Sequence, residues 1–188
     1  MKKICLICLV IFAVSLFYGC NIEKDKESER LYREWYDEVL KGFGQDSIQN
    51  TVIAANTIAE YRVVYNIALV RYDYYSLQVS ENGTGKFTFM RHESEDFDTG
   101  EIVLNVIQDI SVEETNILLE VIEDNKFFRI PTIHPREENG LDGRTVFAEG
   151  FNGSKTHFVK MWEPDEKYPI SKIHKAFADF ADTIADRT

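Results

Sequence analysis

Cysteine is scarce in this sequence, with three residues among 188. Cys5 and Cys8 lie within an apolar run over residues 4–18, and the third is Cys20. That run would rise about 22 Å as a helix, which is short of a bilayer's hydrocarbon core of about 30 Å. Its length, and the two lysines before it, are typical of a signal peptide. Removal of residues 1–19 would leave Cys20 alone, which excludes an internal disulfide and a thiol catalyst.

The apolar run ends in Leu16-Phe17-Tyr18-Gly19-Cys20, which resembles the lipobox of bacterial lipoprotein precursors. Phe17 and Tyr18 are bulkier than the residues usual at their positions. The resemblance implies that residues 1–19 are a signal peptide and that Cys20 carries the lipid, palmitate among its acyl chains. It places the protein in the bacterial cell envelope, on an inner or an outer membrane. The alternative is an uncleaved anchor helix with an incidental cysteine.

Basic residues are few relative to acidic ones, 21 against 32, for a net charge of −11. Two lysines would leave with residues 1–19, so the mature 169 residues would carry 19 basic against 32 acidic residues, a net charge of −13. Such a body is repelled by nucleic acid and by anionic lipid headgroups, which excludes nucleic-acid binding. Lipid, and not surface charge, is therefore expected to hold the protein to a membrane. A negative surface suits a basic protein partner, or serves solubility.

The mature sequence divides into a lipidated cysteine with a charged tether, residues 20–27, and one domain, residues 28–188. Ser28 is expected to cap a helix with one aromatic stripe, which Gly42 and Gly44 end. Residues 46–59 are ambiguous, and Ile48, Val52, Ala55 and Ala59 would share one helical face. Beyond Glu60 the sequence favours a strand.

The rest of the sequence alternates hairpins with helices. Asn82-Gly83 and Asn152-Gly153 supply hairpin turns, and Ser111 with Glu114 forms a capping box before a helix that ends near Asn125. The expected strands are residues 61–65, 74–80, 86–91, 101–107, 145–151 and 155–162. The middle helix is expected to bury Ile117, Leu118, Val121 and Ile122, and the last helix, from Pro169, Ile170, Ile173, Phe177, Phe180 and Ile184. Hairpin-linked strands pair antiparallel, so the predicted fold class is α+β, a mostly antiparallel sheet covered by amphipathic helices.

From about Glu60 to Ile184 the chain resembles a family of uncharacterised bacterial domains. The matching segments are Tyr61-Arg62, residues 126–131, Gly140-Leu141-Asp142-Gly143, Glu149, residues 156–159 and Trp162-Glu163-Pro164. The chain departs from the family pattern at Val146, where a tryptophan is usual, and at Met161-Trp162-Glu163-Pro164, which replaces Arg-Trp-Ser-Pro. The resemblance supports the order of elements and implies no activity.

One group of polar and aromatic residues is a candidate catalytic or binding site. Glu149 and His157 are placed on facing strands of the second hairpin, where they could share a face near Trp162, with Asp142 just upstream. A carboxylate beside a histidine can orient it as a general base, but no nucleophile or metal-ligand spacing completes the set. The alternative is a structural cross-strand pair with an Asp-Gly turn.

The sequence gives little support to a metal, phosphate or cofactor site. The acidic residues of 93–101 lack the spacing of a calcium-binding EF-hand and are typical of a solvated loop. His92, His134 and His174 are isolated, and no phosphate-binding loop or cofactor signature is present. Two hypotheses follow. The first is a membrane-anchored, non-enzymatic protein-binding module: an inhibitor, an immunity factor or an assembly accessory. The second is an envelope enzyme or small-ligand binder that uses Asp142, Glu149, His157 and Trp162.

Overall fold

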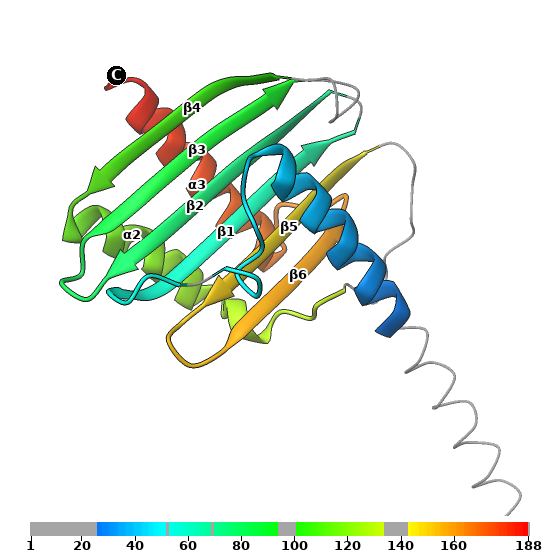
Figure 1. The fold of residues 1–188 in the computed structure, drawn as a ribbon, viewed down its shortest axis with the longest axis horizontal. Coiled ribbons are helices and arrows are strands. Elements are labelled where there is room, and N and C mark those ends of the chain that lie inside the picture. The colour runs from blue at the N-terminus through cyan, green and yellow to red at the C-terminus, as the bar shows by residue number, and fades with distance from the viewer. Residues whose placement is uncertain (1–25, 52, 69, 94–100, 134–142, 188) are drawn as a thin grey trace, which may run out of the picture. The chain divides into compact units, whose positions relative to one another are not determined.

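The computed structural model describes residues 26–51, 53–68, 70–93, 101–133 and 143–187 (Figure 1). The chain divides into two compact units, Met1–Trp35 and Tyr36–Thr188. A helix over residues 26–42 crosses that boundary. Ser28 lies inside this helix, so its predicted N-cap role is wrong. Arg30 pairs with Glu27 (Nη2–Oε1 2.6 Å) and Glu34 (Nη1–Oε1 2.5 Å), and such pairs one turn apart stabilise the helix already at its first described turn.

The body is a six-stranded antiparallel sheet in the order β4-β3-β2-β1-β5-β6 (Figure 1). The strands are β1 (Thr57–Ile67), β2 (Arg71–Ser80), β3 (Gly85–Glu93), β4 (Glu101–Ile110), β5 (Arg144–Phe151) and β6 (Thr156–Trp162). The first four form a meander, and the β5–β6 hairpin returns to pair on the free side of β1. This architecture confirms the predicted α+β class and every expected hairpin.

Two helices cover one face of the sheet. They are α2 (Val112–Asp124) and α3 (Pro169–Ala185), which lie behind the strands in Figure 1. The predicted capping box is confirmed, because Ser111 Oγ accepts from the Glu114 amide (3.2 Å) and Glu114 Oε2 from the Ser111 amide (2.9 Å). Pro169 occupies the first turn of α3, as predicted. The apolar stripes of α2 and α3 pack against the sheet in one core. The strand residues in this core alternate along each strand and include Val63, Leu77, Phe87 and Val146.

The buried stripe of α2 differs from the prediction, since Ile117 is exposed, Val121 is only partly buried and Thr115 is buried instead. The helix buries Thr115, Leu118 and Ile122, which are spaced by three and four, whereas Ile117 is 58% exposed. Ile117 lies about 100° around the helix from Leu118 and so faces outward, since consecutive helical residues do not share a face.

The opposite face of the sheet is covered in part by residues 36–48. Tyr36 packs against Phe147 and Phe158, with ring centroids 5.6 Å and 5.3 Å apart, and Phe43 packs against Tyr74. β1 and β2 therefore carry nearly continuous buried runs, as strands covered on both faces do. Whether residues 46–59 are helical was left open by the sequence, and the shared helical face does not form in the described residues. The described part of residues 46–56 is turn and loop, and β1 begins at Thr57, which pairs with Ser80 of β2.

The chain returns from α2 to the second hairpin through a short 3-10 helix, η1 (Phe127–Arg129). Phe127 and Ile130 are buried, so this segment packs on the core as predicted. Ile133 then forms a parallel bridge with Lys160, whose amide donates to Thr132 O (2.8 Å). This segment therefore covers part of the outer side of β6.

Candidate functional site

The residues predicted to form one site in the second hairpin lie on two faces of the sheet. Glu149 pairs with Phe158, and His157 pairs with Gly150. Because side chains alternate along a strand, Glu149 and His157 point to opposite faces. The prediction that they share a face is therefore wrong. The hairpin register decides the face of each side chain, and a shift of one residue reverses it.

The surroundings of the two residues differ accordingly. His157 Nε2 lies 2.8 Å from the carbonyl oxygen of Ile130, and the imidazole meets the Phe127 ring edge-on at 5.3 Å. Trp162, opposite Thr145, lies on the Glu149 face but at the far end of β6. Asp142 lies outside the described residues. The structure thus gives no support to an enzyme or ligand site in which Glu149 and His157 act together.

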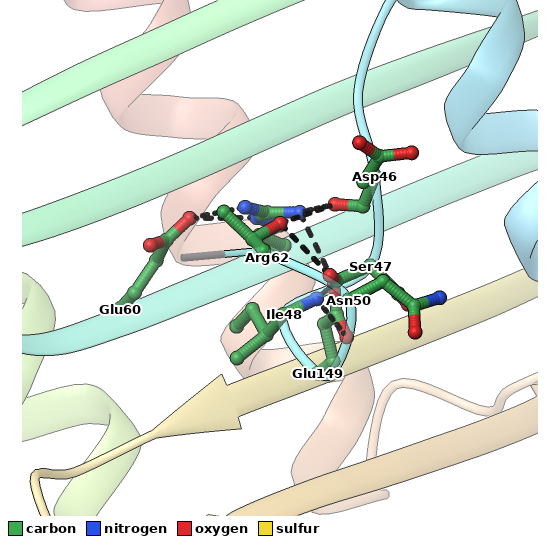
Figure 2. A network of polar contacts seen from close by, with 8 residues as sticks. Asp46, Ser47, Ile48, Asn50, Glu60, Arg62 and Glu149 are labelled. Atoms are coloured by element: carbon green, nitrogen blue, oxygen red, sulfur yellow. Dashed lines mark hydrogen bonds and ion pairs between the residues drawn. The ribbon is translucent and has the colours of Figure 1, made fainter. Parts of the chain in front are cut away.

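Glu149 instead belongs to a buried ionic network centred on Arg62 (Figure 2). Arg62 Nη2 lies 2.6 Å from Glu60 Oε1, and its Nη1 lies 3.4 Å from Glu149 Oε1. Arg62 also donates to the carbonyl oxygen of Asp46. The Ile48 amide donates to both carboxylate oxygens of Glu149, at 2.9 Å and 3.0 Å. The network therefore joins strands β1 and β5 to the 46–48 loop.

Burial dominates the electrostatics of this network. It raises the pKa of Glu149 to about 7, although the Arg62 cation and the Ile48 amide act to lower that pKa. Burial also raises the pKa of Tyr36, whose hydroxyl is buried near Glu149 without a hydrogen bond of ordinary geometry. Burial disfavours the Arg62 cation, but the acidic groups around it, among them Glu60, raise its pKa overall.

This network is a structural clamp and not a reaction site. The side chains of Glu60, Arg62 and Glu149 are each at most 4% exposed, so a substrate cannot reach their charged atoms. Loss of one partner of such a network leaves a buried charge uncompensated, which costs about 3–5 kcal/mol. The clamp fixes residues 46–48 against the sheet. Its sequence signal was a pair of charged residues, Glu60 and Arg62, within a strand otherwise rich in apolar residues.

A second ionic group lies under α3. Asp73 is 1% exposed and is bound by Arg91 (Nε–Oδ1 2.7 Å) and Arg71 (Nε–Oδ2 3.3 Å). His174 stacks on Tyr65 with ring centroids 4.2 Å apart, and burial lowers the pKa of His174 to about 4. The imidazole is therefore neutral near pH 7, and its buried Nε2 has no hydrogen-bond partner among the described residues.

A shallow cavity of about 270 Å³ adjoins His174, between α3 and the ends of β1 and β5. The cations on its rim are partly neutralised by the chain itself. Lys175 pairs with Asp179 (2.7 Å) and Arg144 with Glu163 (3.1 Å). The cavity is also smaller than the 300–1,000 Å³ usual for ligand pockets. The cavity is therefore a weaker candidate for a binding site than the exposed strand β4.

Strand β4 lies at one edge of the sheet (Figure 1) and carries exposed apolar side chains. Ile102, Val103 and Ile107 are 40%, 55% and 61% exposed. We call β4 with these three side chains the β4 edge. Within the described residues, no strand pairs with its outer side. This surface is a candidate for contact with another protein, because long exposed strands with apolar side chains are prone to pair.

Sequence reasoning missed the β4 edge. Residues 101–107 were correctly predicted as a strand, but a strand's position in the sheet follows from long-range pairing. The signal available was the lack of any charged residue in Ile102-Val103-Leu104-Asn105-Val106-Ile107, which is unusual for a strand at an edge.

The sequence matches no protein-family model and no curated protein. The resemblance to uncharacterised bacterial domains therefore stays a prediction, as does the lipobox, since Cys20 lies outside the described residues. No helix in the described part of the chain has the length and apolar character needed to span a membrane. Among the same residues, no group of three or more histidine, cysteine or acidic side chains is arranged to hold a metal ion.

Proposed function

We propose that this protein is a lipid-anchored, non-enzymatic binding module of the bacterial cell envelope, whose folded body binds another protein. The anchor is the lipid expected on Cys20. The proposal assigns binding to the β4 edge and leaves the ionic networks of Arg62 and Asp73 a structural role.

One observation carries the proposal: the exposed apolar side chains of the β4 edge. Ile107 and Val103 are both more than half exposed, four residues apart on one strand. Apolar side chains on a free strand are a liability unless a partner covers them. The chain as a whole is acidic, with a net charge of −11. A basic partner is therefore favoured, and its association would be salt-sensitive.

The test is a capture experiment with the full-length chain in mild detergent as bait in an envelope extract. Three baits are compared: the unchanged chain, Ile107→Lys, and Ile117→Lys as the matched control. Ile117 is 58% exposed and Ile107 61%, so both substitutions place the same charge at an equally open site. The proposal expects a stoichiometric partner that the unchanged chain and Ile117→Lys retain, and that Ile107→Lys and high salt release. A partner that Ile107→Lys binds equally well would contradict it.

A further inference from the structure

We infer that the partner supplies an extended segment with basic ends, which adds to the sheet as a strand alongside β4. This inference rests on the proposed function and names its binding mode and the chemistry of the partner. An edge strand directs every second backbone N–H and C=O away from its neighbour. An added strand satisfies those groups, while exposed side chains on the edge select its sequence.

The two edges of the sheet differ in a way that singles out β4. Beside β6, the segment that contains Ile133 bridges to Lys160 and takes its amide hydrogen bond. Within the described residues, nothing equivalent lies beside β4. β4 also contains no lysine and no proline, the residues with which natural edge strands block pairing. Its protective features are the register shift opposite Arg91 and His92, where Val103 is the extra residue, and the charges of Glu101 and Asp109 near its two ends.

The charges at the ends of β4 indicate a basic partner. Glu93 lies directly opposite Glu101 in the β3–β4 register, and both residues are exposed. Like charges directly opposite one another destabilise a sheet, so a cation placed beside Glu101 relieves this repulsion. At the other end of β4, Asp109 adds a second carboxylate, but Lys86 lies directly opposite it and offsets part of its charge, so Glu101 attracts a cation more strongly. Between these ends, Val103 and Ile107 favour apolar residues on the added strand.

The same charges disfavour a second copy of this chain as the occupant. An antiparallel β4–β4 pair in which Val103 of one copy faces Ile107 of the other is centred on Asn105. That register sets Glu101 of each copy directly opposite Asp109 of the other, two repulsive pairs in one interface. Any other symmetric register loses the match between Val103 and Ile107.

The test is hydrogen exchange, followed by mass spectrometry, on the full-length chain in detergent. The probe is a peptide of about nine residues, long enough to span most of the edge, that alternates valine with threonine and has lysine at both ends. A matched peptide has glutamate at both ends. We expect the lysine-ended peptide to slow exchange in β4 and not in β6, and the glutamate-ended peptide to have no effect. Glu101→Gln should raise the peptide concentration that gives half-maximal slowing of exchange about threefold. Glu113→Gln, at an exposed position on α2, should leave that concentration unchanged.

Three results would overturn the inference: unchanged exchange in β4, equal slowing by both peptides, or slowing in β4 that depends on the concentration of the free chain. The last would mean that a second copy already occupies the edge. Failure here is separable from failure of the proposed function. A partner captured through Ile107 without slower exchange in β4 would leave the binding module standing and remove strand addition alone.

Discussion

At the scale of single residues, the Glu149 carboxyl links the fold to pH. Burial raises its pKa from 4.5 to about 7, so the folded chain holds this proton more tightly than the unfolded chain does. The stability that the raised pKa contributes is complete below about pH 4.5 and is lost as the pH rises through 7. His174, whose pKa burial lowers to about 4, has the opposite effect: its contribution is lost as the pH falls below about 6.5.

Glu149→Gln should therefore change the pH dependence of stability. A glutamine retains an oxygen that accepts from the Ile48 amide but does not ionise. Between about pH 5 and pH 8, the unchanged chain should lose about 2–3 kcal/mol of unfolding free energy relative to the variant, because one proton is released over most of that range. Urea denaturation at both pH values measures this difference. The His174 effect cancels, since both chains contain it. Parallel curves for the two chains would show that Glu149 has an ordinary pKa.

The sequence identified Glu149 and His157 as notable but paired them wrongly. The sequence marks both as polar residues within strands, but it does not show which face of the sheet each side chain occupies until the strand register is known. The true partners of Glu149 are Arg62 on β1 and the backbone of Ile48. These contacts bring together residues about one hundred positions apart, which local patterns cannot reveal.

At the scale of elements, two serines separate a real helix cap from an apparent one. Ser111 begins α2 with a complete capping box, whereas Ser28 lies within the helix of residues 26–42. Ser111→Ala should lower the free energy of unfolding by about 1 kcal/mol, because the Glu114 amide loses its Ser111 Oγ acceptor and the capping box is broken. Ser28→Ala should cost nothing, since alanine is the better helix former. Thermal unfolding of both variants provides the comparison, and equal losses would contradict the assignment of the two positions.

The strands and hairpins were predictable because their signals are local: Asn-Gly turns and β-branched runs for the sheet, spacings of three and four for α3. The 46–59 segment was not. Its apolar residues fit a helical spacing, but Ile48 is held by Glu149 and the chain enters β1 at Thr57. Tertiary contacts there outweigh a weak local preference.

At the scale of the whole molecule, the sheet has one face covered by α2 and α3 and the other covered only in part, by residues 36–48. Antiparallel sheets tolerate such partial cover, since one face can meet solvent. The sequence predicted the fold class but not the strand order, and hence not that β4 lies at an edge. That order results from β5 pairing with β1 across more than seventy residues of sequence.

The last prediction concerns the attachment of the whole chain. A covalent lipid on Cys20 would hold this acidic protein to a membrane that repels its surface, because two or three acyl chains anchor firmly without charge. Cys20→Ser should therefore abolish labelling of the protein by palmitate and block removal of residues 1–19. Cys8→Ser, within the predicted signal peptide, should change neither result, which makes it the matched control. Membrane fractionation with mass measurement of the N-terminus tests both variants. If Cys20→Ser retains residues 1–19 and the membrane, loss of lipid has merely blocked their cleavage; if the unchanged chain also retains them, residues 1–19 are an uncleaved anchor and the lipoprotein assignment is wrong.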